Sequence, residues 1–72
     1  MKILLQDARN NLYFRCGNFW TSNPETAFDF RQTRNLFDFV QQNHLQHVQV
    51  VVASENFKYW EVLPLERLTS TT

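Results

Sequence analysis

The side chains that could do chemistry in this sequence are few and lie far apart. His44 and His47 stand three residues apart, and Cys16 could add a soft sulfur ligand to their two imidazoles. The histidines fall where a helix is expected to end and a strand to begin, so this spacing does not place them on one helical face. No motif supplies a fourth ligand. We therefore expect no metal site, with His44 near a helix end and His47 on the surface.

Catalytic groups are equally sparse. Cys16 falls in a strand pattern beside Gly17, whereas reactive thiols favour helix N-termini and electropositive clefts, so we expect a small buried or half-buried hydrophobe. Asp29 and Asp38 are the nearest acidic pair around the helix, and both are expected on solvated positions. A single glycine excludes a glycine-rich phosphate loop. These patterns predict a non-enzymatic protein with no cofactor and no small-molecule substrate.

Aromatic side chains are the richest resource of the chain. Phe, Trp and Tyr make up 15% of its 72 residues, and such rings can build either a core or a contact surface. Trp and Tyr are also enriched at the hot spots of protein interfaces. Five side chains from the expected strands form our candidate interface: Tyr13, Arg15, Trp20, Tyr59 and Trp60.

A second hypothesis gives the same rings a different partner. Single-stranded nucleic acid stacks on aromatic side chains that are interleaved with cations, and Arg15 and Lys58 lie near Tyr13 and Trp60. Seven basic and seven acidic residues cancel, however, and no RNA-recognition motif is present. The neutral charge disfavours nucleic acid, which remains the alternative.

The N-terminal third predicts a β-hairpin. Residues 2–8 alternate as a strand, Arg9-Asn10-Asn11 forms a turn, and residues 12–16 form the second strand, because Asn tolerates the positive φ of tight turns. Gly17-Asn18 is a further turn signal. After it, residues 19–21 either continue the second strand or form a short extension.

The remaining chain predicts one helix and a second hairpin. Asn23 can cap a single turn that starts at Pro24, and a longer helix begins at Thr33. That helix should end near Asn43-His44, with Leu45 folding back onto it. Residues 48–53 read as an inner strand with apolar side chains on both faces, and residues 59–63 form a last strand that Pro64 ends.

These elements predict a two-layer α+β fold of type ββαββ. One helix would cover one face of a four-stranded antiparallel sheet within a single domain at residues 1–65, and residues 66–72 would form a frayed tail. The strand order is left open. If the first and third strands are neighbours, Ile3 and Leu4 meet the valine strand in the centre.

A short segment carries a resemblance. Residues 19–30 contain Trp20-Thr21, Pro24-Glu25, Ala27 and Phe30, a Trp-Thr-x-x-Pro-Glu-x-Ala-x-x-Phe pattern that resembles one in small uncharacterised bacterial proteins. The likeness extends through the helix into the valine strand. It implies a similar compact fold and a bacterial, cytoplasmic origin, and it implies no activity.

Composition and the second sheet face complete the functional expectation. One cysteine allows no internal disulfide, and the apolar run at residues 1–5 is too short for a signal peptide, so we expect a cytoplasmic protein without a membrane segment. An apolar sheet face that no helix covers is typical of an interaction surface. We therefore predict a small protein–protein interaction or adaptor domain anchored by Tyr13, Trp20 and Trp60, whose partner is either another protein or a second copy in a homodimer.

Overall fold

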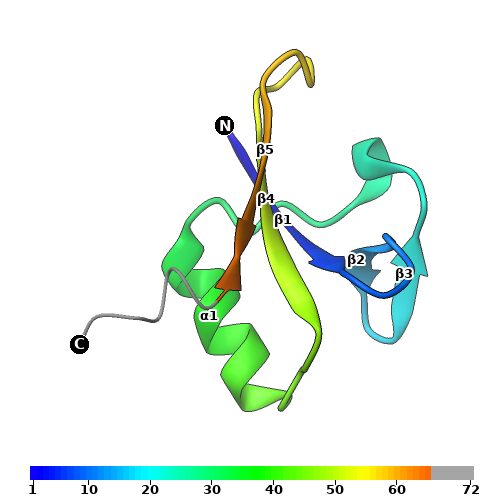
Figure 1. The fold of residues 1–72 in the computed structure, drawn as a ribbon, viewed down its shortest axis with the longest axis vertical. Coiled ribbons are helices and arrows are strands. Elements are labelled where there is room, and N and C mark those ends of the chain that lie inside the picture. The colour runs from blue at the N-terminus through cyan, green and yellow to red at the C-terminus, as the bar shows by residue number, and fades with distance from the viewer. Residues whose placement is uncertain (66–72) are drawn as a thin grey trace.

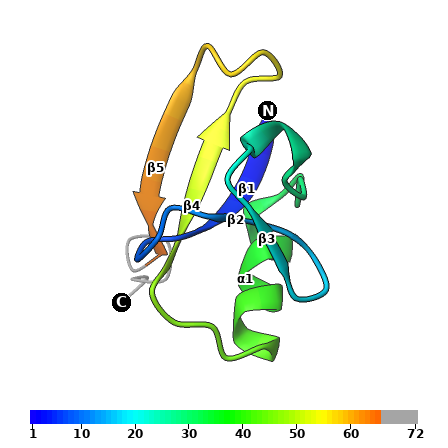
Figure 2. The ribbon, with the colours of Figure 1, turned by 90° about the vertical axis from the view of Figure 1, so that its right-hand side faces the viewer.

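The computed structural model describes residues 1–65 and forms two layers, a sheet and one helix (Figure 1). The predicted frayed tail, residues 66–72, lies outside the described residues. In chain order the elements are β1 (Lys2–Asp7), β2 (Tyr13–Cys16), β3 (Phe19–Thr21), a 3-10 turn (Pro24–Thr26), α1 (Thr33–Gln42), β4 (Val48–Ala53) and β5 (Trp60–Pro64). The strands lie in the order β3-β2-β1-β4-β5, and all neighbours are antiparallel. Figure 2 shows α1 on one side of the sheet.

The α+β class with one helix on one face is confirmed, but the expected four-stranded sheet is wrong because there are five strands. Gly17 has a φ of 53°, a conformation that favours glycine, and the chain reverses there instead of extending the second strand. Trp20 then pairs with Phe14, and the register shifts between Phe14 and Cys16. Cys16 is exposed beside this irregularity, so its expected burial is also wrong.

The β1–β4 ladder is the centre of the sheet. It pairs six residues on each strand, from Lys2 opposite Ala53 to Asp7 opposite Val48. Leu4, Leu5 and Val51 are fully buried there. This arrangement confirms β4 as an inner strand and puts the valines next to β1, as expected if the first and third predicted strands were neighbours.

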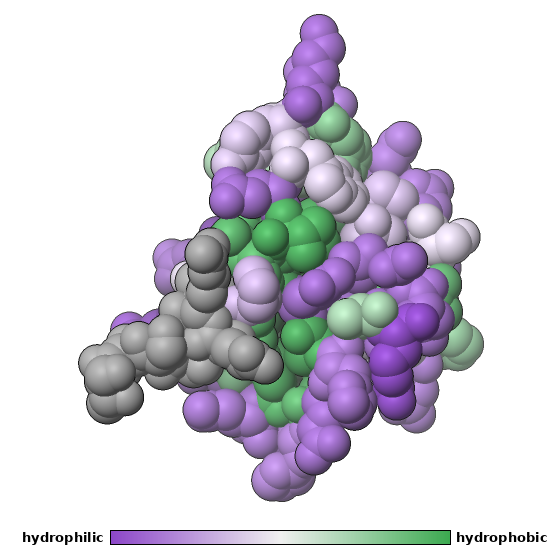
Figure 3. All heavy atoms as spheres, viewed as in Figure 1, coloured by the Kyte–Doolittle hydropathy of each residue, from purple (hydrophilic) through white to green (hydrophobic). Residues whose placement is uncertain are grey.

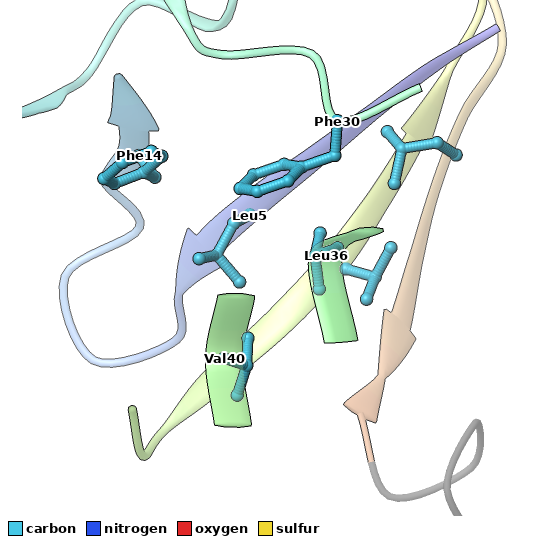
Figure 4. Close-up of a cluster of buried hydrophobic side chains, with 7 residues drawn as sticks. Leu5, Phe14, Phe30, Leu36 and Val40 are labelled. Carbon is cyan, nitrogen blue, oxygen red and sulfur yellow. The ribbon is translucent and has the colours of Figure 1, made fainter. Parts of the chain in front are cut away.

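The main core fills the space between α1 and the sheet. Alternate strand residues point toward the helix, among them Leu5 and Phe14, and they meet Leu36 and Val40 of α1 (Figure 4). Phe30 completes this cluster from the segment between the 3-10 turn and α1. We call this side of the sheet the helix face and the opposite side the far face.

Residues 28–30 lie along the edge of β1 beyond its short pairing with β2, and they hydrogen-bond to it. The N–H of Phe30 donates to the carbonyl of Ile3 at 2.9 Å, and the N–H of Ile3 donates to Oδ1 of Asp29 at 3.0 Å. Oδ1 of Asp29 also accepts from the N–H of Arg31 at 2.9 Å. Asp29 is therefore a half-buried structural side chain, and its expected solvated position is wrong.

The predicted cap of the single turn at Asn23 and the predicted end of the long helix near His44 are both confirmed. Oδ1 of Asn23 accepts from the N–H of Glu25 at 3.0 Å and caps the 3-10 turn. At the end of α1, His44 adopts a φ of 52°, and Leu45 donates its N–H to the carbonyl of Val40 at 3.1 Å. This is the Schellman arrangement, in which Leu45 packs back on the core.

The β1–β2 turn is organised by a carboxylate. Asp7 accepts from the N–H and Nε of Arg9, at 2.9 and 3.1 Å, and its Oδ2 lies 2.9 Å from the second guanidinium nitrogen. The N–H of Asp7 also donates to the carbonyl of Leu12 at 2.8 Å. Hydrogen bonds from Arg9 lower the pKa of Asp7 below its usual value, although burial acts in the opposite direction.

Replacing this carboxylate should make stability less sensitive to acid. Because the pKa of Asp7 is lowered on folding, the charged form stabilises the fold above the unfolded pKa of 3.8, and this contribution is lost as pH falls through the folded value. We expect Asp7→Asn to reduce the free energy of unfolding by about 1 kcal/mol at neutral pH, a modest value because Arg9 is mostly exposed.

Urea unfolding at neutral pH and below the pKa of Asp7 measures this difference, which should shrink in acid. Asp38→Asn makes the same chemical change at an exposed position on α1 and should alter neither value. A penalty for Asp7→Asn that is equal at both pH values would contradict the role of the charge.

Candidate functional site

The structure divides the five predicted interface residues between the two faces of the sheet. Trp20 lies on the helix face, half-buried, with its ring 5.7 Å from that of Phe14. Tyr13 and Trp60 meet on the far face, and Tyr13 is only 8% exposed. Tyr59 and Arg15 are both exposed. The five residues therefore do not form one surface, and Tyr13 is not available as an exposed anchor.

The far face is covered largely by rings of the chain itself. Tyr13 on β2 and Trp60 on β5 are separated by two strands, which in a flat sheet would put their backbones about 14 Å apart. Their ring centroids are nevertheless 5.9 Å apart, edge to face at 88°. The two rings lean toward each other over the buried row of Leu4 and Val51. The expected uncovered face is therefore mostly closed, which corrects the prediction.

Phe57 adds a third ring to this cover. It lies in the β4–β5 loop with a φ of 61°, packs against the Leu4 cluster and reaches within 6.0 Å of the Trp60 ring. Its N–H donates to the carbonyl of Ser54 at 2.9 Å, which fixes the loop. The ammonium of Lys2 lies 4.9 Å from the Phe57 centroid, a cation–π contact.

The opposite end of the far face is polar but satisfied. Gln6 and Gln49 stand opposite each other in the β1–β4 ladder, and Nε2 of Gln49 donates to Oε1 of Gln6 at 2.8 Å. Gln6 is buried, so this bond offsets the cost of removing its amide from water. Because the rings and this amide pair cover most of the far face, the exposed part of that face is its margin at β5.

Exposed apolar side chains concentrate on β5 and the residue before it. Tyr59 is 47% exposed, Trp60 39% and Val62 41%. Register places Trp60 beside Ala53 and Val62 beside Val51, so both continue the apolar rows of the far face to the sheet margin. Figure 3, which has the viewpoint of Figure 1 with β5 in front, shows apolar surface at the middle of the molecule. We call Tyr59, Trp60 and Val62 the β5 surface.

Hydrogen bonding shows which backbone groups of β5 are free to meet a partner. In antiparallel pairs, opposed residues alternate between exchanging and not exchanging hydrogen bonds. The N–H of Ser54 donates to the carbonyl of Tyr59 at 3.1 Å, in register with the β4–β5 ladder, so Glu61 and Leu63 bond to β4. The backbone groups of Trp60, Val62 and Pro64 then point outward.

The β1–β4 ladder independently indicates that the backbone groups of Val62 point away from β4. The N–H of Ala8 donates to the carbonyl of His47 at 2.8 Å, and alternation from this pair makes Val51 bond to β1. The backbone groups of Val51 cannot then bond to Val62, which lies opposite it on β5. Pro64 fits this arrangement, because its missing N–H falls on the outer edge.

A second apolar feature lies on the other side of the molecule. A hollow of about 380 Å³ opens between α1 and the segment before it. Phe28, which is 47% exposed, stands beside it, with its ring 4.8 Å from that of Phe30. The hollow is lined by Phe28, Phe30, Asn35, Asp38, Phe39 and Gln42. The lining combines rings with amides and carries one formal charge, that of Asp38.

The candidate metal ligands do not gather into a site in the part of the chain that the structure describes. Among residues 1–65, no group of three or more His, Cys, Asp or Glu side chains could hold an ion. His44 and His47 are exposed and both adopt positive φ, at 52° and 63°, so each serves a change of chain direction. Cys16 is a free, exposed thiol.

Two tyrosines have raised pKa values for different reasons. Burial raises the pKa of Tyr13, because its phenolate would lie among apolar groups. Tyr59 donates a hydrogen bond to the carboxylate of Glu61, which raises the pKa of its phenol. Both rings therefore remain neutral at physiological pH.

Sequence reasoning missed Val62, Phe57 and Phe28. Val62 follows Trp60 at the two-residue spacing of one strand face, and this spacing was a usable signal once β5 was placed at the margin. Phe57 gave no such signal, because a left-handed conformation is uncommon for Phe. Phe28 gave no signal either, because its exposure depends on where residues 28–30 dock.

Comparison with protein-family models, with curated proteins and with solved structures finds no match to this chain. Across residues 1–65, no helix combines the length and the apolar character needed to cross a membrane.

The ring contact on the far face should be measurable as an energetic coupling. We expect Tyr13→Ala to cost about 3 kcal/mol of stability, because the ring is buried, and Trp60→Ala to cost about 1.5 kcal/mol. The double variant should lose about 1 kcal/mol less than the sum, since each single change already removes the edge-to-face contact.

Chemical unfolding of the four proteins measures this cycle. Tyr59→Ala is the matched control, because it removes a ring of similar exposure outside the Tyr13 contact. Its effect should add to that of Tyr13→Ala. Full additivity of Tyr13→Ala and Trp60→Ala would show that the rings do not cooperate in covering the far face.

Proposed function

We propose that this domain acts by binding another protein chain along the β5 surface and catalyses no reaction. The observation that carries the proposal is the coincidence of two properties on one strand. Trp60 and Val62 expose large apolar side chains, and their backbone groups point to the outer edge of the sheet. Within residues 1–65, no strand pairs with that edge.

Addition of a partner strand would use both properties. Backbone hydrogen bonds of an added strand are independent of sequence and supply affinity, whereas alternate side chains supply specificity. On the far face a partner would meet Trp60 and Val62, and on the helix face it would meet Tyr59 and Glu61. A ring of the size of Trp60 is also the usual centre of an interface hot spot.

The single-stranded nucleic-acid alternative receives less support. Stacking requires ring faces that are open to the bases, but Tyr13 is buried and Trp20 packs on Phe14. Arg15 lies on β2 and Lys58 in the β4–β5 loop, at separate positions in the fold. Among residues 1–65, Arg15 and Lys58 therefore form no cationic stripe along the exposed rings of β5.

Site-specific photo-crosslinking in the cell that makes the protein tests the proposal. A photo-reactive phenylalanine analogue at Val62 should yield covalent adducts on irradiation, because the partner strand would lie against this side chain. Phe19 is the matched control: it is 70% exposed and lies on β3, the edge strand at the other end of the sheet.

We expect adducts from position 62 and none from position 19, and Trp60→Ala should reduce those from position 62. The mass of each adduct identifies the class of partner, a second copy or a different chain. Equal adducts at both positions, or none at position 62, would contradict binding along the β5 surface.

A further inference from the structure

We infer that the β5 edge binds a second copy of this chain, strand against antiparallel strand, with Val62 of one copy opposite Val62 of the other. This inference rests on the proposed function, since it names the partner of the same surface. It would join the two five-stranded sheets into one continuous sheet.

Symmetry limits how two identical edges can pair. Two copies of one strand that pair antiparallel are related by a two-fold axis perpendicular to the sheet, so the far face of one copy continues into the far face of the other. Residues that lie opposite each other must then share a face. The centre of the pairing must be a single residue, and the candidates near the middle of β5 are Glu61 and Val62.

Charge selects between these two centres. Both registers use the outward groups of Trp60 and Val62, and both allow the same number of backbone hydrogen bonds. A centre at Glu61 would put the two Glu61 carboxylates directly opposite each other, which is destabilising. A centre at Val62 puts Glu61 opposite Leu63 and leaves no like charges opposed within β5.

The Val62 register also joins apolar surfaces. Within one copy, Leu4, Val51 and Val62 form one row across three strands of the far face. The second copy would extend this row as Val62, Val51 and Leu4, and the two half-exposed valines would become neighbours. Trp60 would face Pro64 of the other copy, a contact between an aromatic ring and an apolar ring.

Pro64 helps to define where pairing ends. Its carbonyl can accept from the N–H of Trp60 in the other copy, but it has no N–H to return the bond. The contact is therefore short. An interface of this size is weak, and we expect a dissociation constant on the order of 100 µM.

Solution mass across a concentration series is the first test, with the full chain. The weight-average mass should rise from 8.7 kDa at low concentration toward twice that value. Val62→Lys should hold the protein at the monomer mass, because two ammonium groups would face each other. Phe19→Lys places the same charge on the opposite edge strand and should dimerise like the wild type. Circular dichroism checks that both variants fold.

Disulfide trapping tests the register. In a Cys16→Ser background, which removes the exposed native thiol, Val62→Cys should form a covalent dimer with oxidised glutathione as the electron acceptor. Opposed residues in a hydrogen-bonded pair have Cα atoms about 5.5 Å apart, within the range of a disulfide. Glu61→Cys in the same background should remain monomeric.

The outcomes separate the inference from the proposed function. A wild-type protein that stays monomeric, with no Val62→Cys dimer, overturns self-pairing. In that case photo-crosslinked adducts of a different mass at position 62 would still uphold binding along β5. A dimer trapped through Glu61→Cys but not Val62→Cys overturns the register. A dimer that Val62→Lys leaves intact overturns the β5 surface as its interface.

Discussion

The rest of the structure depends on the pairing of β1 with β4. Six opposed residue pairs join strands that are distant in sequence, and Leu4, Leu5, Val50 and Val51 at their centre are fully buried. Because side chains alternate along a strand, this one ladder places apolar groups on both faces of the sheet. Each face must then be covered, and the fold covers the two in different ways.

The helix face is covered by α1 and by Phe30, whereas the far face is covered by side chains from β2, β5 and the β4–β5 loop. Tyr13, Phe57 and Trp60 close over Leu4 and Val51 without any further layer. Because only side chains cover the far face, this cover ends at the edge strand β5. Trp60 therefore has one side on the core and one side in solvent, and this position supports our proposal that a partner adds along β5.

Features set by local chemistry were predictable from the sequence. Asn23, Thr33 and His44 marked real turns and helix ends, and the valine alternation identified an inner strand with two buried faces. Features that depend on how several strands pack together were not predictable from the sequence. The sheet gained β3 because the chain reverses at Gly17. Tyr13 was misjudged because its burial depends on the position of Trp60, which comes from the other end of the chain.

The most direct measurement is residue-resolved amide hydrogen exchange at low and high protein concentration. We expect slow exchange at Leu4 and Val51 in both samples, because these residues bond to each other at the centre of the sheet. The outward N–H of Val62 should exchange rapidly in the dilute sample and slow markedly in the concentrated one. Equal exchange of Val62 in both samples, or a slowing confined to β3, would contradict self-pairing of this domain along β5.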